Sequence, residues 1–474
     1  MMHMRAASRP HVLIIVQNLP VPLDRRVWLE CQALVAAGYR VSVICPKGPD
    51  DPAFEEIDRV RIHKYRPAPP ARGLAGYLWE FSYCWLRTAW LAGRIWRREP
   101  FDALQACNPP DTYWALALLH RPPLCRHHTA KFVYDQHDLN PEVFRSRFGE
   151  PTGLVQRAQL RFLYWLEWCT YRVADHVIAT NHSYRTIAIN RGRCRPDGVS
   201  VVRSGPDTRR MRPVDGLPVL RRGRSHLLVY LGVMGPQDGV DVALRALQVL
   251  VAAHGRTDVH LALLGFGDCY QDLVRLAREL GLEEYVTFTG RADARMITEY
   301  LSTADIGLAP DPLNPLNDVS TMNKTMEYMS FALPVVTFDL VEARVSAGDA
   351  AAYVDPIGTL DECVHRFAEA ITELIDDPER RVGMALAARR RAESVLDWQP
   401  QRRAYVAVYD RLLDFASTPF PSPEPDPADG TDEWGHRMIN LADPEEFRTF
   451  ARQRSRPHAS PNSFPNASPL ASER

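Results

Sequence analysis

The stretch HVLIIVQNLPVPLDRRVWLECQALVAAGYRVSVIC, residues 11–45, decides the fold of this chain. Its apolar run His11–Val16 predicts a buried strand, and Arg25–Ala37 has the apolar spacing of a helix. Gly38 is a suitable helix stop, and Arg40–Cys45 is a second strand-like run. A strand, a helix and a strand in this order form a β-α-β unit, whose two strands are parallel in one sheet.

The same alternation continues along most of the 474 residues. It stops between residues 207 and 225, where arginine, proline and glycine dominate, as in an interdomain linker. We therefore expect an α/β protein with two Rossmann-like, doubly wound domains that face a cleft. Further strands are expected at Ala103–Ala106, Phe132–Asp135, His176–Thr180, Val199–Arg203, His226–Leu231, His260–Leu264, Val286–Thr289, Ile306–Ala309, Pro334–Phe338 and Ala351–Val354.

These patterns also divide the chain into segments. The expected order is a first domain of residues 1–206, a linker of 207–225, a second domain of 226–396, and a last helix over 397–416. Residues 417–474 accumulate Pro, Ser, Asp and Glu, so we expect a mostly disordered tail. One short helix is possible in it, near Pro444–Arg452.

The composition is that of an ordinary globular protein. The net charge is −1 with 24% charged residues, so no overall field indicates a nucleic-acid partner. The nine cysteines include no C-x-x-C pair, which argues against a disulfide framework or a zinc site. No apolar signal segment precedes the first strand, so we expect a cytoplasmic protein.

Residues 77–96 are the one candidate for membrane contact. The segment is rich in Trp and Tyr, but Glu80, Arg87 and Arg94 interrupt it, so it does not have the composition of a spanning helix. Two interpretations remain: an amphipathic helix packed on the core, or an interfacial helix that touches a membrane. The second would place the protein at the inner face of the plasma membrane.

In the first half, polar loops follow the expected strands, where parallel sheets bind ligands. Asp24, Arg25 and Arg26 begin the first helix and could contact an acceptor or a phosphate. The alternative is that Asp24 is an N-cap and the arginines lie on the surface. Asn108 lies at a strand end, and so do His137 and Asp138, a histidine followed by an acid that can donate, accept and orient. A structural histidine is the alternative.

In the second half, glycines mark three strand ends. Gly232 and Gly235 lie in a glycine-rich loop, and a similar Gly265-Phe266-Gly267 follows the next strand, with Gly290-Arg291 after the third. Glycine lets a backbone approach a phosphate closely. None of these loops is a dinucleotide fingerprint or a P-loop, but together they predict a nucleotide site.

The strongest single candidate is Lys324 in Asn323-Lys-Thr-Met-Glu-Tyr-Met329. The chain has 57 basic residues, of which only four are lysines, and Lys324 is the only one after Lys131. In the first turn of a helix its charge adds to the helix dipole, which suits a diphosphate, and Glu327 on the same face can bind a ribose diol. Asp318, Ser320 and Thr321 lie just upstream. The alternative is an exposed i, i+3 ion pair.

The order and spacing of these stretches resemble family 4 retaining glycosyltransferases, which have the GT-B architecture. The resemblance covers about residues 10–415 and rests on Tyr134–Asp138, Ala179–Ser183, Val202–Pro206, Tyr230–Gly232, Leu264–Gly267, Phe288–Arg291, Ala304–Leu308, and Asn323–Met329 followed by Pro334. It resembles most the subfamily with an N/S-K-x-x-E-Y-M motif. It implies a donor nucleotide sugar in the second half and an acceptor in the first, with Asn181 among the acceptor residues. It also implies that the last helix, 397–416, returns to the first domain.

The chain departs from the family pattern at three positions. Val319 stands where members often carry glutamate, and Val233 and Asp238 stand where many carry arginine and lysine. Lys324 would then carry more of the phosphate charge. No Asp-x-Asp motif for a diphosphate-bound metal occurs.

The sequence therefore predicts a transferase without a metal or cofactor. It would move a sugar from a nucleoside diphosphate to the hydroxyl of a sugar or lipid-linked acceptor, in polysaccharide or glycoconjugate synthesis. Retention of anomeric configuration is implied by the resemblance alone. Two other interpretations stay open: a nucleotide-sugar 2-epimerase of the same fold, and a degenerate glycosyltransferase that serves as a non-catalytic subunit.

Overall fold

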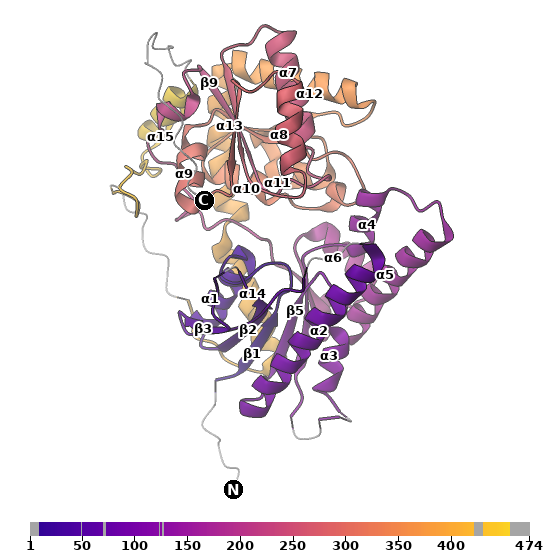
Figure 1. Ribbon diagram of the computed structural model, residues 1–474. Helices are drawn as coiled ribbons and strands as arrows, with labels where there is room; N and C mark the ends of the chain where they lie inside the picture. The colour runs from indigo at the N-terminus through magenta and orange to yellow at the C-terminus, as the bar shows by residue number, and fades with distance from the viewer. Residues whose placement is uncertain are drawn as a thin grey trace. The chain divides into compact units, whose positions relative to one another are not determined.

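The chain forms two compact units in the computed structural model (Figure 1). The structure describes residues 9–48, 50–69, 73–122, 124–125, 128–420 and 430–455. The first unit comprises residues 1–205 and 398–424, and the second comprises 206–397 and 425–474. Each unit is an α/β domain built on its own parallel sheet, which confirms the predicted fold class.

The first unit contains an eight-stranded sheet in the order β3-β4-β2-β1-β5-β6-β7-β8. All neighbours are parallel except β3 and β4, which form an antiparallel hairpin. In chain order the elements are β1 His11–Ile15, α1 Arg25–Ala36, β2 Arg40–Pro46, β3 Phe54–Ile57, β4 Val60–Tyr65, α2 Gly73–Arg98, β5 Ala103–Cys107, α3 Trp114–Leu119, β6 Lys131–Gln136, α4 Asn140–Phe148, α5 Leu154–Val173, β7 His176–Ala179, α6 His182–Asn190, β8 Val199–Val201 and α14 Trp398–Leu413.

Helices cover both faces of this sheet, as expected for a parallel sheet whose strands are apolar on both sides. One apolar cluster joins the sheet to α1 and α14, and the other joins it to α2 and α3. Figure 1 shows α2 and α3 on the second of these faces, and α3 contacts α5. The last helix of the domain, α14, thus returns from the far end of the sequence to pack on α1.

The second unit contains a six-stranded parallel sheet in the order β11-β10-β9-β12-β13-β14. The order reverses between β9 and β12, a switch point of the kind at which doubly wound sheets bind ligands. Its elements are β9 His226–Leu231, α7 Val240–Ala252, β10 Val259–Leu264, α8 Tyr270–Glu279, β11 Val286–Gly290, α9 Ala294–Thr303, β12 Ile306–Ala309, α10 Asn323–Ser330, β13 Val335–Phe338, α11 Val341–Ala347, β14 Ala351–Val354, α12 Leu360–Asp376, α13 Pro378–Arg391 and α15 Pro444–Ser455.

Two segments outside the predicted bounds of the second domain belong to the second unit. Residues 207–225, expected as a linker, belong to the second unit, where Arg221 is buried and pairs with Asp305 at 2.5 Å. In the tail, the short helix expected near Pro444–Arg452 is present as α15, and it packs on the second unit, because Phe447 and Phe450 are buried against α13. Composition alone does not reveal these contacts, since each depends on a buried minority of residues within a polar segment.

The long helix α2 occupies the aromatic segment noted above and is amphipathic. Leu91, Ala92 and Ile95 are buried against the sheet, whereas Trp79 and Trp90 are exposed. None of the helices within the described residues is long and apolar enough to cross a membrane.

Candidate active site

In the second unit, three loops meet at the carboxyl ends of β9, β10 and β12 with their backbones in direct contact. A Cβ on Gly265 would lie 1.8 Å from the carbonyl oxygen of Gly232, and one on Gly239 would lie 2.1 Å from that of Pro310. Gly267, at a φ of +156°, would place its Cβ 2.6 Å from the backbone of Met234. Only glycine allows the backbones of these loops to come so close. The glycines at the strand ends are therefore needed for packing, whether or not they also contact a ligand.

Lys324 lies in the first turn of α10 and is almost fully buried. Its Nζ is 2.5 Å from Asp311 Oδ1 and 3.9 Å from Asp238 Oδ1, and it lies 4.9 Å from the centroid of the Tyr230 ring. Burial alone would lower the pKa of Lys324, but the two carboxylates, Asp311 first, raise it above its ordinary value. The lysine therefore stays charged at neutral pH.

The buried position of α10 rules out one of the two interpretations of its motif. Lys324 and Glu327 are 8% and 7% exposed, so they are not a solvent-exposed i, i+3 ion pair on a surface helix. The Lys324 side chain instead packs beside the Gly232 backbone: a Cβ added at Gly232 would lie 3.5 Å from Lys324 Cε. The ammonium is therefore held at one fixed place. That arrangement suits recognition of an anion at this edge of the sheet.

The closest partner of Lys324 was not among the sequence candidates. Asp311, which follows β12, is 1% exposed, and its Oδ2 has no hydrogen-bond partner among the described residues. The sequence offered a hint in Pro310-Asp311-Pro312, an acid fixed between two prolines directly after a strand. Its carboxylate pairs with the ammonium of Lys324.

The polar residues upstream of Lys324 make local structural contacts. Asp318 Oδ1 accepts from Val341 N at 3.0 Å, and so caps α11. Ser320 Oγ donates to the carbonyl of Leu316 at 2.7 Å, and Thr321 Oγ1 donates to Glu342 Oε2 at 3.3 Å. Asn323, by contrast, is exposed at the start of α10. These contacts fix the loop that leads into the helix.

The loops after β10 and β11 present an aromatic ring. Phe266 is 41% exposed, and the guanidinium of Arg291 lies 4.8 Å from its ring centroid. In the loop after β9, Asp238 Oδ2 accepts from Gly235 N at 2.9 Å, which closes that turn. An exposed ring with a cation above it is a surface on which a planar base can stack.

In the first unit, Arg26 is the centre of a buried cluster. Its Nη2 donates to Asp135 Oδ1 at 2.8 Å, its Nη1 donates to the carbonyl of Val202 at 2.9 Å, and its Nε lies 3.0 Å from Glu30 Oε1. Burial alone would raise the pKa of Asp135, but the charges of Arg26 and His137 hold it well below its usual range. Arg26 is thus buried rather than on the surface, and it contacts both Asp135 and His137.

His137 stands at the edge of this cluster. Its Nε2 is 2.8 Å from Asp135 Oδ2 and 3.1 Å from Arg26 Nε. Burial would lower the pKa of His137, but the Asp135 carboxylate raises it above its ordinary value. The ring is held in one orientation by these contacts, as a group that binds a substrate hydroxyl needs to be.

Asn108 and Asp138 complete the loop around His137. Asn108 is 2% exposed, and its Oδ1 accepts from the backbone N–H groups of His137 at 2.7 Å and Asp138 at 3.1 Å. Its Nδ2 donates to the carbonyl of Asp138 at 2.7 Å. Burial raises the pKa of the Asp138 carboxyl. Asn108 therefore positions the histidine loop from the neighbouring strand end.

The remaining acceptor candidates divide by exposure. Asp24 caps α1, accepting from Val27 N at 3.1 Å, as the alternative interpretation predicted. Asn181 is fully buried and caps α6, accepting from Tyr184 N at 2.7 Å. Arg25, in contrast, is exposed.

Three potential metal ligands lie in the same cluster as His137. Ligand atoms of Cys107, Asp135 and His137 all lie within 4.8 Å of one another. Burial, together with the Asp135 charge, raises the pKa of the Cys107 thiol, and the Arg26 guanidinium already contacts Asp135 and His137. A protonated thiol and a fixed cation are poor surroundings for a metal ion, so we interpret the group as an ion-pair cluster.

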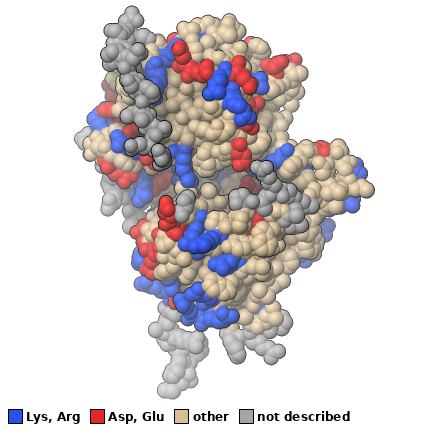
Figure 2. Space-filling model, in the orientation of Figure 1, with Lys and Arg blue, Asp and Glu red and all other residues tan. Residues whose placement is uncertain are grey.

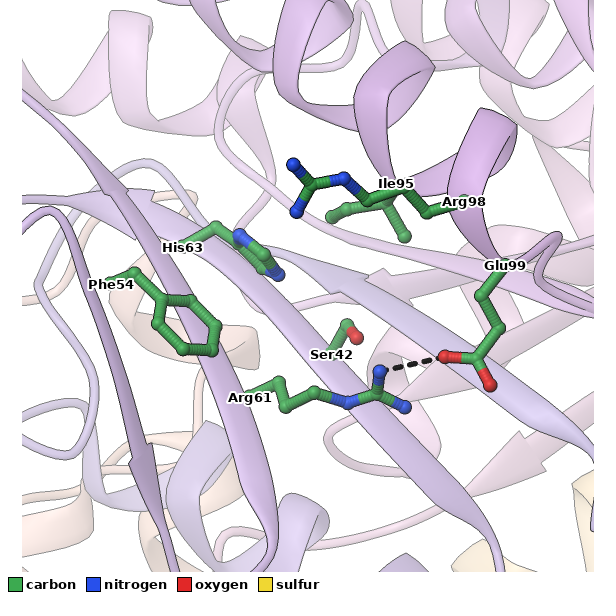
Figure 3. Close-up of a pocket in the computed structure, with 7 residues that line it drawn as sticks. All are labelled: Ser42, Phe54, Arg61, His63, Ile95, Arg98 and Glu99. Atoms are coloured by element: carbon green, nitrogen blue, oxygen red, sulfur yellow. Dashed lines mark hydrogen bonds and ion pairs between the residues drawn. The ribbon is translucent and has the colours of Figure 1, made fainter.

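A separate pocket of about 310 Å³ lies near the amino ends of the first unit's strands (Figure 3). Arg61 and Glu99 pair across it at 2.6 Å, and burial lowers the pKa of its His63 to about 4. It contains none of the candidate residues and lies away from the carboxyl ends at which parallel sheets bind ligands. Its lining residues are Ser42, Phe54, Arg61, His63, Ile95, Arg98 and Glu99.

Two family models match the chain, one to each half. Residues 23–210 match "Glycosyltransferase Family 4", and residues 225–377 match "Glycosyl transferases group 1". Between them they include every residue of the two strand-end sites described above.

Curated relatives are similar at a moderate level. A glycogen synthase of Mycobacterium tuberculosis is 26% identical over 82% of this chain and 90% of its own length. A D-inositol 3-phosphate glycosyltransferase of Thermomonospora curvata is 27% identical over 51% of this chain and 56% of its own length. The chain thus covers just over half of the length of the D-inositol 3-phosphate glycosyltransferase.

Solved structures share the fold. A sucrose-phosphate synthase from Thermosynechococcus elongatus superposes with a TM-score of 0.67 at 16% identity, covering 86% of this chain and all of its own. The Anabaena protein HepE, solved in complex with UDP-glucose, superposes with a TM-score of 0.60 at 17% identity, over 85% of this chain and 99% of its own.

Proposed function

Because this chain belongs to the GT-B glycosyltransferases, we propose that it transfers a sugar from a nucleoside diphosphate sugar to an acceptor hydroxyl, with retention and without a metal. The second unit would bind the donor and the first the acceptor. The named activities of the relatives, among them glycogen synthase and mannosyltransferases, support a place in polysaccharide or glycoconjugate synthesis.

One observation carries this proposal, the buried cation at the start of α10. When the bond between sugar and diphosphate breaks, negative charge develops on the leaving phosphate. Lys324 supplies a full positive charge at the positive end of a helix dipole, and Asp311 fixes the ammonium before the substrate arrives. Preorganised charge of this kind stabilises the transition state without reorganisation during the reaction.

The remaining candidates have complementary roles in the proposal. Glu327 would accept hydrogen bonds from the ribose diol, and the base would stack on Phe266 under Arg291. HepE was solved with UDP-glucose, so UDP-sugars are the first donors to try. In the first unit, His137 would bind a hydroxyl of the reacting sugar, while the leaving phosphate oxygen takes the acceptor proton.

The first experiment asks which donor binds. Purified full-length protein is mixed with one UDP-, GDP- or ADP-sugar at a time, and the thermal unfolding midpoint is recorded, since a bound donor stabilises by mass action. The active donor is then assayed by release of nucleoside diphosphate with the wild type, Lys324→Ala and Glu327→Ala. Lys131→Ala, at the amino end of β6, is the matched lysine control.

We expect the two site variants to lose most of their turnover and the control to keep it. Full activity in both site variants would sink the assignment. A new sugar nucleotide formed without acceptor would mean an epimerase. Failure of every nucleoside diphosphate and sugar nucleotide to bind would favour a non-catalytic subunit.

A further inference from the structure

Exposed tryptophan is confined to two helices of the first unit. All ten tryptophans lie within the described residues, and four of them are exposed. Trp79 and Trp90, 59% and 50% exposed, lie on α2, and Trp165 and Trp168, 48% and 50% exposed, lie on α5. Large aromatic side chains are costly to leave in water, so their collection on one pair of helices needs an explanation.

On α2 these residues form one outward stripe. Trp79, Leu86 and Trp90 recur at helical spacing, so they lie on a single side of the helix. Trp90 has arginines stacked on it, with the guanidinium groups of Arg87 and Arg94 at 5.3 and 4.8 Å from its ring centroid. The opposite side of α2 is buried against the sheet. The exposed residues of the stripe are Trp79, Leu86, Trp90, Arg94 and Arg97.

A second stripe of the same composition runs along α5. Leu154 is 83% exposed at its start, and Phe162 stacks on Trp165 at a centroid distance of 5.6 Å. Six of its exposed positions recur every three or four residues, so they lie on one side. They are Leu154, Ala158, Arg161, Trp165, Trp168 and Arg172. Val155, Arg157 and Phe162 of the same helix are also exposed.

The two stripes belong to the same layer of the domain. α2 contacts the segment before α3 through Thr88 Oγ1 and the hydroxyl of Tyr113, 3.4 Å apart. α3 in turn contacts α5, with the rings of Trp114 and Trp165 6.1 Å apart and perpendicular. Figure 1 shows α2, α3 and α5 together on one side of the sheet. We call the two outward stripes, with α3 between them, the α2–α5 face.

The charge on this face has one sign. α2 and α5 carry seven exposed arginines, namely Arg87, Arg94, Arg97, Arg98, Arg157, Arg161 and Arg172. The two acidic residues of these helices are not exposed: Glu80 is half-buried, and Glu167 is buried and pairs with Arg191 at 2.7 Å. Although the whole chain has a net charge of −1, the exposed charged residues of α2 and α5 are all positive. Figure 2 shows this side of the first unit as a largely tan surface with blue groups.

We propose that the α2–α5 face binds a membrane surface that carries anionic lipid headgroups. Tryptophan rings favour the headgroup layer, because they combine an apolar body with a polar N–H, and arginines pair with lipid phosphates. Apolar area and positive charge on one face are the combination that interfacial binding requires. If two copies of the chain associated through this face, the seven arginines of one copy would lie against the seven of the other. The repulsion between these like charges disfavours self-association.

The test is vesicle sedimentation of the full-length protein. Large unilamellar vesicles of phosphatidylcholine alone are compared with vesicles that contain phosphatidylglycerol, at low and high salt. No sugar donor is present, so the outcome is independent of the proposed transfer reaction. The wild type is compared with Trp90→Ser/Trp165→Ser/Trp168→Ser and with Arg94→Glu/Arg97→Glu/Arg161→Glu. Val219→Ser/Ile357→Ser, two changes at exposed apolar residues of the second unit, is the matched control.

We expect the wild type and the control to bind anionic vesicles, and each stripe variant to bind about tenfold or more weakly. Tryptophan emission should shift to the blue with anionic vesicles and be quenched by brominated lipid, both less so in the tryptophan variant. Circular dichroism confirms that each variant is folded. No binding by the folded wild type, binding unchanged in the stripe variants, or a concentration-dependent dimer that hides the four tryptophans would overturn the proposal.

Discussion

Replacing Lys324 by methionine should damage both stability and catalysis, and a second change can separate the two effects. The substitution keeps much of the side-chain volume but removes the ammonium that lies 2.5 Å from Asp311. The carboxylate left behind is 1% exposed, and one of its oxygens already has no hydrogen-bond partner within the part of the chain that the structure describes. Loss of one member of a buried pair costs about 3–5 kcal/mol, because the other charge stays buried and uncompensated.

Lys324→Met combined with Asp311→Asn removes both charges. The buried amide costs about 1–3 kcal/mol for its unsatisfied polar atoms, so the double variant should recover part of the lost stability. Catalysis should not recover with it. Removing a preorganised charge that faces a developing anion costs about 10²- to 10³-fold in turnover, and the double variant still lacks that charge.

The assays are urea unfolding for stability and release of nucleoside diphosphate for turnover, on the wild type, both single variants and the double variant. Asp311→Asn alone should retain more activity than Lys324→Met, since Asp238 remains 3.9 Å from the ammonium. If the double variant regained wild-type turnover together with stability, Lys324 would serve only to neutralise Asp311, and the proposed contact with the diphosphate would be refuted.

Three further predictions concern the stability of the two units. Burial lowers the pKa of His176 to about 4, so the unfolded chain binds the proton more tightly and the folded state loses stability as the pH drops below 6.5. His176→Gln should remove about 2 kcal/mol of that loss at pH 5. If the unfolding free energies of variant and wild type changed with pH in parallel, this prediction would be contradicted. Gly307→Ala places a Cβ 2.5 Å from the Tyr328 ring and should cost about 1–3 kcal/mol; an unchanged thermal midpoint counts against it. Truncation after Glu424 removes α15 and should lower the midpoint of the second unit. A midpoint equal to that of the full-length chain would argue against the packing of α15.

The sequence predicted the elements that are apolar throughout. β9 and β12 occupy the expected residues, because a strand buried on both faces is a continuous apolar run that ends at a polar or glycine residue. The hairpin of β3 and β4 was missed. Its turn residues Asp58 and Arg59 have φ of 49° and 67°, a conformation that usually selects Asn-Gly, so the common turn signal is absent.

The candidate site was predictable in its charged groups but not in their partners. Lys324 stands out because lysine is rare in this chain, and His137 because it follows a strand. Asp311 and Asp135 were missed, since an aspartate in a sequence gives no sign that it will be buried beside a cation. Their pairing depends on strands and helices that are distant in the sequence, and so only the fold reveals it.

The buried polar cluster explains why α14 returns to the first domain. The hydroxyls of Tyr405 and Tyr409 donate to Gln105 Oε1, the first at 2.7 Å, across about 300 residues of sequence. This fixes the amide, so its Nε2 must donate, at 2.8 Å to Glu30 and 3.1 Å to Asp135. Asp135 in turn orients His137. The last helix of the domain therefore does more than cover apolar surface: it sets the direction of the hydrogen bonds on which the candidate histidine depends.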